Sequence, residues 1–189
     1  MNDETGVAVG VIGVGSMGQH HARVYHSLSD VELKGVYDAD DDRAIEVAGR
    51  HGTEPRDLDE LLGLVDAVSI AVPTRFHHET AKRCLEAGCD VLIEKPFVRD
   101  SSKGRDLLRR ADEHDAILQV GHVERFNPAV LALPDILEGR EIIAFNAKRL
   151  GPPLDRTVKD SAVLDLMIHD LDIVLSLMDE TPVTISSAG

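Results

Sequence analysis

The first 120 residues alternate short apolar runs with longer segments in which apolar positions recur at a helical period. The short, β-branched runs predict strands at residues 7–12, 31–37, 67–72, 91–93 and 117–120, with another near Thr53. The amphipathic segments predict helices at residues 16–29, 40–50, 58–62, 77–87 and 101–114, and Gly88 should end the fourth of these. This alternation is typical of βαβ units, so residues 1–122 are expected to form a doubly wound α/β domain with a parallel sheet.

A different pattern begins after Gly121. The expected elements are a short helical stretch that residues 125–128 open, a strand with one solvated face at 141–149 and a loop at 151–153. A buried helix at 163–178 and a strand from Val183 should follow. A few such elements bury too little apolar surface to be stable alone. Residues 123–189 are therefore expected to be the beginning of a second, α+β domain that is incomplete.

The composition, 43% hydrophobic and 29% charged, is typical of a soluble globular protein. No apolar run reaches the ~20 residues that a membrane span needs, and the acidic N-terminus lacks the basic and apolar parts of a signal peptide. Cys84 and Cys89 make neither a disulfide framework nor a complete metal site, so no metal is expected and both should be free thiols. These features predict a cytoplasmic protein.

The formal net charge of −14 argues against nucleic acid or an anionic membrane as a partner. Aspartate is abundant, as in Asp40-Asp41-Asp42, and lysine is scarce. Salt screens repulsion among such carboxylates, because the Debye length falls to ~3 Å at 1 M. Either a halophilic protein whose stability rises with salt or an ordinary acidic cytosolic protein fits this pattern, and the sequence leaves both open.

A glycine-rich hexamer follows the first strand directly. Its residues, Gly13-Val14-Gly15-Ser16-Met17-Gly18, fit the pattern G-x-G-x-x-G. The first glycine permits a tight turn, the second lets the backbone approach a pyrophosphate, and the third lets the helix pack close to the strand. Amides at the helix start then face the phosphates. The position between a strand and a helix makes this a dinucleotide-binding signal rather than an ordinary glycine turn.

Asp38 ends the second strand, twenty residues after Gly18. A carboxylate there accepts hydrogen bonds from the adenosine ribose hydroxyls and repels a 2′-phosphate. The three aspartates that follow add to the repulsion, and only Arg43 lies nearby to offset it. The sequence therefore favours NAD over NADP as the cofactor.

The segment Glu94-Lys95-Pro96 ends a strand at the carboxyl edge of the sheet, where open α/β folds bind ligands. Lys95 there can hold a substrate hydroxyl and keep a neighbouring base unprotonated through its charge. It can equally serve a structural salt bridge, and this residue taken alone favours the salt bridge.

Asp165 and His169 lie four residues apart on the apolar helix and hence on one face. Histidine is the natural proton acceptor near neutral pH, and a carboxylate beside it can orient the ring. A satisfied core pair explains the two residues equally well. Asp170 and Asp172, which also interrupt the helix, are expected to face solvent.

The other histidines carry weaker signals. Solvated surface positions are expected for His20, His21, His26, His51 and His114. His77 and His78 are ambiguous, because they follow Pro73-Thr74 at the carboxyl edge of a strand.

Several motifs together carry a family resemblance. Besides the glycine loop, they are Pro73-Thr74-Arg75-Phe76-His77, Glu94-Lys95-Pro96, Gly121-His122, Arg125-Phe126-Asn127-Pro128 and Asp165-x-x-x-His169. From Val7 to about Leu177 the chain resembles the glucose–fructose oxidoreductase / inositol dehydrogenase / MocA-like (Gfo/Idh/MocA) family, whose first domain is a Rossmann fold. Residues 149–153 with 165–172 resemble the branch that acts on UDP-N-acetylglucosamine at C3.

The resemblance implies a two-domain enzyme whose second domain is an open, mostly antiparallel sheet carrying the substrate. It implies that Lys95, Asp165 and His169 surround the reacting carbinol. It further implies that a second set of residues lines the nicotinamide side: Pro73, Thr74, His77, Glu94 and Lys95. Family members continue well beyond the length of this chain.

We therefore expect an NAD-dependent oxidoreductase, or its cofactor-binding part, that oxidises a secondary hydroxyl of a sugar, nucleotide sugar or polyol. His169 would take the hydroxyl proton, Lys95 would hold the substrate oxygen and Asp165 would orient the histidine. A homo-oligomer is expected for the full-length enzyme. The alternatives are a non-catalytic dinucleotide-binding sensor or regulatory module, and another Rossmann oxidoreductase, for which Glu94-Lys95-Pro96 has no obvious role.

Overall fold

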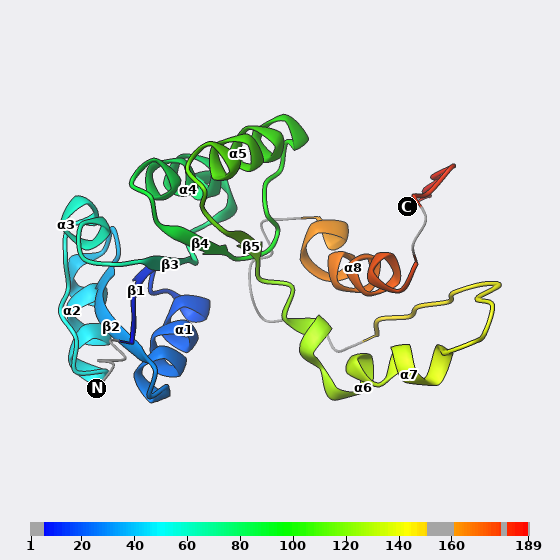
Figure 1. Cartoon of the computed structure of the whole chain (residues 1–189), viewed down its shortest axis with the longest axis horizontal. Helices are drawn as coiled ribbons and strands as arrows, with labels where there is room; N and C mark the ends of the chain where they lie inside the picture. The colour runs from blue at the N-terminus through cyan, green and yellow to red at the C-terminus, as the bar shows by residue number, and fades with distance from the viewer. Residues whose placement is uncertain (1–5, 151–160, 179–180, 189) are drawn as a thin grey trace. The chain divides into compact units, whose positions relative to one another are not determined.

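The computed structural model describes residues 6–150, 161–178 and 181–188 (Figure 1). The chain divides into two compact units, Met1–Gly121 and His122–Gly189. The expected loop at residues 151–153 lies outside the described residues. No helix in the described ranges is long and apolar enough to cross a membrane.

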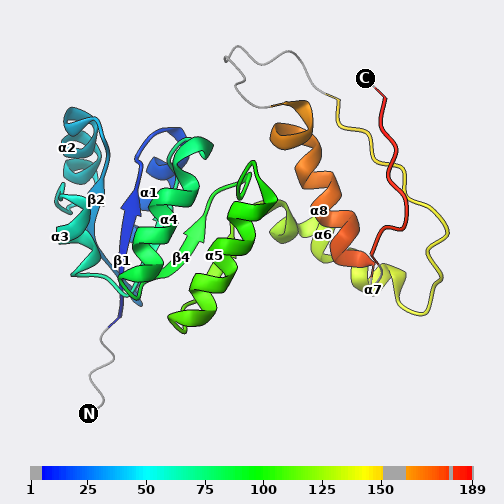
Figure 2. The same cartoon turned by 90° about the horizontal axis from the view of Figure 1, so that it is seen from above.

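The first unit is built on a five-stranded sheet of order β2-β1-β3-β4-β5. Its strands are β1 (Val7–Ile12), β2 (Val31–Tyr37), β3 (Ala67–Ile70), β4 (Asp90–Ile93) and β5 (Leu118–Val120). Every neighbouring pair is parallel. Figure 2 shows the arrows of β1 and β4 running in the same general direction. The chain turns to opposite sides of β1 when it forms β2 and β3, and a crevice opens at such a reversal above the carboxyl ends of the strands.

Helices cover both faces of this sheet. They are α1 (Ser16–Ser27), α2 (Asp41–Arg50), α3 (Leu58–Leu62), α4 (His77–Glu86) and α5 (Ser101–Glu113), with a 3₁₀ turn η1 (Thr74–Phe76) before α4. In Figure 1, α4 and α5 lie on one side of the strands and α1 on the other. Gly88 follows α4 at φ +81°, so the predicted left-handed glycine is confirmed. The doubly wound α/β fold predicted from the sequence is therefore present.

The apolar positions of the predicted elements supply the core. Leu61, Ile70, Leu85, Ile93 and Leu107 are fully buried in one cluster, formed by α3, α4 and α5 against the sheet. A second, smaller cluster joins α1 and α2 to β1 and β2. Burial of each large aliphatic side chain stabilises the fold by about 1.5–3 kcal/mol.

One polar side chain lies inside the sheet. Ser69, in the centre of β3, is fully buried, and its Oγ lies 2.6 Å from the Tyr25 hydroxyl on α1. The hydrogen bond satisfies a group that would otherwise be costly in the core.

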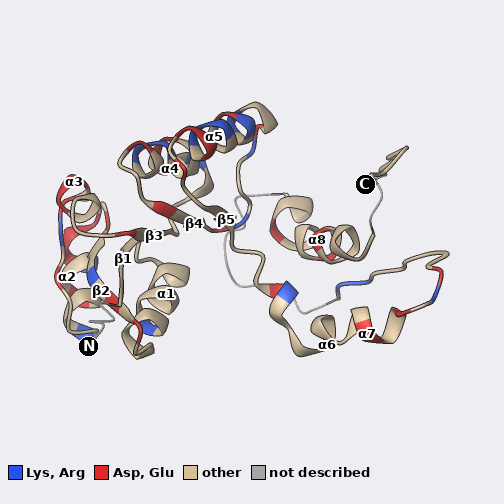
Figure 3. Ribbon diagram, viewed as in Figure 1, with Lys and Arg blue, Asp and Glu red and all other residues tan. Residues whose placement is uncertain are grey.

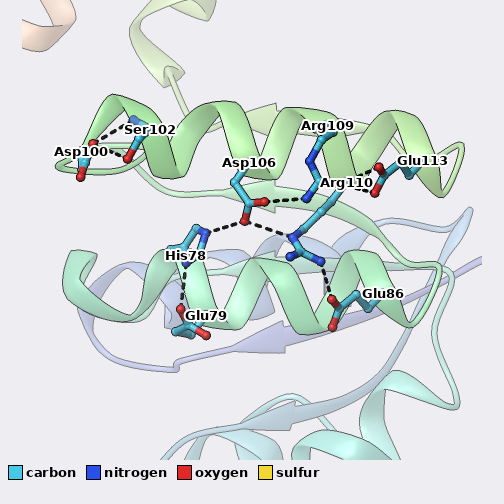
Figure 4. A network of polar contacts seen from close by, with 9 residues as sticks. All are labelled: His78, Glu79, Glu86, Asp100, Ser102, Asp106, Arg109, Arg110 and Glu113. Atoms are coloured by element: carbon cyan, nitrogen blue, oxygen red, sulfur yellow. Dashed lines mark hydrogen bonds and ion pairs between the residues drawn. The ribbon is translucent and has the colours of Figure 1, made fainter.

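A network of ion pairs joins the outer surfaces of α4 and α5 (Figure 4). Asp106 of α5 accepts from Arg109 at 2.7 Å and Arg110 at 3.1 Å, and it lies 2.9 Å from His78 Nε2 on α4. Arg110 also pairs with Glu86 at the end of α4. These contacts hold the pKa of Asp106 far below its ordinary value, chiefly through Arg109 and then His78 and Arg110.

The expected strand near Thr53 is wrong. Only an isolated bridge forms there, between Val36 and Pro55. The bridge consists of two hydrogen bonds, from the Val36 N–H to the Glu54 carbonyl and from the Arg56 N–H to the Val36 carbonyl, and the chain enters α3 at Leu58 without extending it into a ladder. Thr53 instead donates its hydroxyl to the Leu33 carbonyl at 2.8 Å.

The second unit contains short helices. They are η2 (Val123–Phe126), α6 (Pro128–Leu131), α7 (Leu133–Leu137), η3 (Val163–Met167) and α8 (Ile168–Leu177). η3 is π-helical, a rare geometry that occurs mostly as single turns within α-helices and is frequent at functional sites. The helix predicted at residues 163–178 is thus present, but the prediction that it is buried is wrong, since Met167 is 49% exposed and Leu175 48%.

The two strands expected in the second unit are also wrong. Residues 141–150 and 181–188 contain no strand in the structure. An alternating pattern forms a strand only where a neighbouring strand accepts its backbone hydrogen bonds. The described part of this unit supplies no such neighbour.

Candidate functional site

The glycine loop joins β1 to α1 in the geometry that the hexamer predicts. Gly13 adopts φ +85° and donates its N–H to the Tyr37 carbonyl at 2.7 Å. A Cβ on Gly18 would lie 1.8 Å from the Gly13 carbonyl oxygen, so helix and loop touch backbone to backbone. A Cβ on Gly15 would meet nothing within 4 Å. Two of the glycines thus permit close approach within the protein, and Gly15 faces open space.

A cavity of about 770 Å³ opens at this loop. Six of the predicted cofactor residues line it: Gly13, Gly15, Ser16, Met17, Asp38 and Pro73. Its size lies within the range of small-molecule sites. The crevice at the carboxyl ends of β1, β2 and β3 therefore brings the glycine loop, the end of β2 and the turn after β3 together.

The remaining predicted cofactor residues are not among those that line this cavity. Val14 is fully buried, and Gly18 packs against the loop itself. Thr74 begins the 3₁₀ turn beside Pro73. Glu94 and Lys95 follow β4.

Asp38 is held on three sides. Its Oδ2 accepts from the Val14 N–H at 2.8 Å, and its Oδ1 accepts from the Asp40 N–H at 3.0 Å and from Arg43 at 3.1 Å. Its side chain is only 9% exposed. The residue expected to bind ribose thus also fixes the backbone of the glycine loop.

A dinucleotide fits this arrangement. No side-chain hydrogen bond caps α1 within the described residues, so its first amides are available to a pyrophosphate. A Cβ on Gly15 would meet open space, and Asp38 lines the same cavity. Val72 and Phe76 add apolar wall. The groups that could hold such a cofactor are therefore the loop amides and Asp38.

Glu94 is buried, at 7% exposure, between α1 and the end of the sheet. Its Oε1 lies 2.9 Å from His21 Nε2, and its Oε2 accepts from the Lys95 N–H at 3.2 Å. Burial acts to raise the pKa of Glu94, but the hydrogen bond and charge of His21, with the Lys95 N–H, outweigh it and lower that pKa. The solvated position expected for His21 is wrong, since its side chain is 15% exposed.

His77 is also buried, at 1% exposure. Its Nδ1 lies 3.0 Å from the Pro96 carbonyl and its Nε2 lies 2.9 Å from the Val72 carbonyl. A neutral ring can donate to one of these sides only. The ring ties the turn after β3 to the turn after β4, where the Lys95–Pro96 peptide is cis. His78 contacts Glu79 and Asp106 in the surface network.

The predicted catalytic residues are divided between the units. Lys95 belongs to the first, directly after Glu94. Asp165, in η3, and His169, in the first turn of α8, belong to the second, and both are half-buried. The helical run thus carries Asp165 and His169 at adjacent turns, as the four-residue spacing predicts.

The prediction that Asp170 and Asp172 face solvent is wrong. Asp172 is only 10% exposed, and both its oxygens accept from Arg125 at 2.7 Å. Asp170 pairs likewise with Arg149, at 2.9 and 3.2 Å. The motif Arg125-Phe126-Asn127-Pro128 was the sequence signal that could have pointed to a partner for Asp172.

The two cysteines are free thiols, as predicted. Burial raises the pKa of Cys84 to about 12, with a smaller contribution from Cys89. Burial also raises the pKa of Cys89. Neither thiol is therefore a ready nucleophile.

Comparisons with known proteins bear on this site. The model of the Gfo/Idh/MocA family, described as an oxidoreductase family with an NAD-binding Rossmann fold, matches residues 7–122. UDP-N-acetylglucosamine 3-dehydrogenase of Acidithiobacillus ferrooxidans is 40% identical over 182 residues, which are 95% of this chain and 57% of that protein. Inositol 2-dehydrogenase of Rhizobium meliloti is 31% identical, over 97% of this chain and 58% of that protein.

Solved structures agree with these matches. A structure of the Acidithiobacillus enzyme superposes with a TM-score of 0.84 at 35% identity, covering 97% of this chain and 61% of that one. GenD2 from gentamicin A biosynthesis, solved in complex with NAD, gives 0.78 at 28% identity, covering 89% and 52%. The chain thus spans 57% and 58% of the length of the two curated relatives named above.

Proposed function

We propose that this chain acts, whole or as the cofactor-binding part, in an NAD-dependent dehydrogenase of sugars, nucleotide sugars or polyols. It belongs to the Gfo/Idh/MocA oxidoreductase family, which has an NAD-binding Rossmann fold. The observation that carries the proposal is the cavity that unites the glycine loop, Asp38 and Pro73. Within the substrate class, UDP-N-acetylglucosamine is the first compound to assay, since the relative that is 40% identical carries that name.

Each residue has a role in this proposal. The amides at the start of α1 bind the pyrophosphate, and Asp38 accepts hydrogen bonds from the adenosine ribose. NAD, when bound, supplies the acceptor for the hydride that leaves the carbinol carbon. Lys95 holds the substrate oxygen through its ammonium group, the His169 ring takes the hydroxyl proton, and Asp165 orients that ring.

Cofactor binding is tested by titrating the 189-residue chain with NAD in a calorimeter. Gly15→Ala should weaken binding at least ~10-fold, because the new methyl group fills the space in which the pyrophosphate must lie. Gly49→Ala is the matched control, since a Cβ there also meets nothing within 4 Å but Gly49 lies on α2 away from the loop. Wild-type protein that takes up no NAD refutes the proposal.

The catalytic part is tested by turnover of UDP-N-acetylglucosamine and of inositol with NAD. His169→Ala should lower kcat by ~10²–10⁴-fold, the usual contribution of a positioned acid–base group. NAD affinity should persist, because the glycine loop and Asp38 belong to the other unit. A His169→Ala protein that folds and turns over at the wild-type rate would move the proton-accepting role to another residue.

A further inference from the structure

The two carboxylates that follow β2 hold a single guanidinium between them. Arg43 donates Nη1 to Asp38 at 3.1 Å and Nη2 to Asp40 at 2.8 Å. All three residues line the cavity at the glycine loop. At neutral pH this group of three carries one net negative charge, from two carboxylates and one guanidinium.

Asp38 and Asp40 are not equivalent members of this group. Asp38 is nearly buried and braces the loop through the Val14 N–H, as described above. Asp40 is 48% exposed, and its Oδ1 accepts from the Arg43 N–H at 3.1 Å as the N-cap of α2. Both aspartates therefore hold the arginine, but Asp38 also maintains the shape of the loop, whereas Asp40 is half-exposed and caps α2.

Arg43 is placed to act on a cofactor. Its side chain is 42% exposed, so the guanidinium can turn away from Asp40 into the cavity. A guanidinium is the group best suited to bind a 2′-phosphate bidentately. While Arg43 Nη2 donates to Asp40, that nitrogen is not available to donate to a phosphate.

We propose that the Asp40–Arg43 ion pair sets the choice between NAD and NADP, because Asp40 withholds the Arg43 guanidinium from a 2′-phosphate. This inference rests on the proposed function, namely that the cavity binds a nicotinamide dinucleotide. Asp38 keeps its proposed contact with the adenosine ribose and also braces the glycine loop through the Val14 N–H. Asp38→Ala should therefore weaken NAD binding, and it does not isolate the effect of Arg43.

The experiment is calorimetric titration of the 189-residue chain with NAD and with NADP, read as the ratio of the two Kd values. Asp40→Asn removes the charge and keeps an oxygen that can cap α2, and Asp40→Ser is a second variant with the same property. Either should lower the ratio Kd(NADP)/Kd(NAD) by about 10-fold, the size of one charge-assisted hydrogen bond that the released guanidinium donates to the 2′-phosphate.

Two controls separate release of Arg43 from simple loss of charge. Asp41→Asn removes the same charge one residue along, and within the described residues Arg43 makes no ion pair with Asp41. It should change the ratio by ~2-fold at most. In an Arg43→Ala background, Asp40→Asn should change the ratio Kd(NADP)/Kd(NAD) no more than Asp41→Asn does, because there is no guanidinium left to release.

The outcomes distinguish the two proposals. An Asp40→Asn effect that survives in the Arg43→Ala background, or that Asp41→Asn equals, overturns the inference while NAD binding stands. An unchanged ratio in both Asp40 variants overturns it as well. A wild-type chain that binds neither cofactor overturns the proposed function and the inference together.

Discussion

The two units of this chain bury their apolar residues very differently. In the first, Leu85 of α4 and Leu107 of α5 are fully buried against the sheet. In the second, none of the described residues from 122 onward is buried, and Leu171 of α8 is 46% exposed. Yet Figure 3 shows α5 crowded with charged residues of both signs, whereas α8 carries acidic residues and no Lys or Arg.

The difference teaches that burial depends on the neighbours of a helix more than on its own composition. α5 is amphipathic and lies on a sheet, so its one apolar stripe is enough. α8 is the more apolar helix, but the described part of its unit supplies no sheet to cover it. Polar contacts, such as Arg125 with Asp172, take a larger share in holding it.

Truncating one leucine to alanine in each unit should give the largest difference in the free energy of unfolding. Leu85→Ala leaves a cavity in a closed core and should lower the free energy of unfolding by about 2–5 kcal/mol. Leu171→Ala should cost about 0.5 kcal/mol or less, because its side chain is already half exposed. Urea denaturation of both variants measures the contrast. Equal losses would mean that α8 is covered in solution, and the comparison would then fail.

The glycine loop offers the next largest effect. Gly18→Ala should lower the free energy of unfolding by about 1–3 kcal/mol, because the methyl group meets the Gly13 carbonyl. Gly49→Ala in α2 should be neutral or stabilise by up to about 1 kcal/mol, since alanine favours a helix. Thermal unfolding of the two variants decides. A Gly18→Ala protein as stable as wild type would show that the loop can relax.

A smaller effect is expected from the ion pair of the second unit. Removing either partner of Arg125–Asp172 should cost about 1 kcal/mol, the usual worth of a charge-assisted bidentate pair near the surface. Hydrogen exchange on α8 should rise in Arg125→Ala and in Asp172→Asn, while exchange on α4 and α5 stays constant. A double-mutant cycle that gives additive losses would show that the two side chains do not interact.

The smallest effect concerns acid and the network on α4 and α5. The pKa of Asp106 is lowered in the folded protein, so its contribution to stability is complete above the ordinary value of 3.8 and is lost as the pH falls below it. The difference in Tm between wild type and Asp106→Asn should therefore shrink from pH 7 to pH 2. Asp112→Asn, on the same helix, is the control. A difference that is constant with pH would contradict the assignment.

Much of the first unit could be predicted from the sequence. The strand at residues 7–12 and the helix at 58–62 were predicted to the residue, because each pattern meets its partners within the same βαβ units. The strands expected at 141–149 and from Val183 were wrong, because a ladder depends on a partner strand that a local pattern does not reveal.

The site shows the same limit. The position of Asp38 followed from its spacing to the glycines. Its hydrogen bond to the Val14 N–H joins residues 24 positions apart, and no local pattern predicts such a contact. His21 was missed because its partner, Glu94, lies 73 residues away. The available signal was its place three residues after Gly18, on the helix face that meets the sheet.

Two hydrogen bonds on the inner face of α1 fix the helix against the sheet, and because the glycine loop runs directly into α1, they also fix the position of the loop. His21 and Tyr25 lie one turn apart, and they reach Glu94 after β4 and Ser69 within β3. Apolar contacts allow a helix to slide and rotate slightly, whereas hydrogen bonds weaken steeply outside a narrow range of distance and angle. His21 and Tyr25 lie one to two turns after the start of α1, and their hydrogen bonds restrict both its shift along its axis and its rotation. The position of the loop amides thus depends on two side chains that do not line the cavity. A conservative change such as Tyr25→Phe should therefore alter the shape of the cavity while every residue on its wall stays the same.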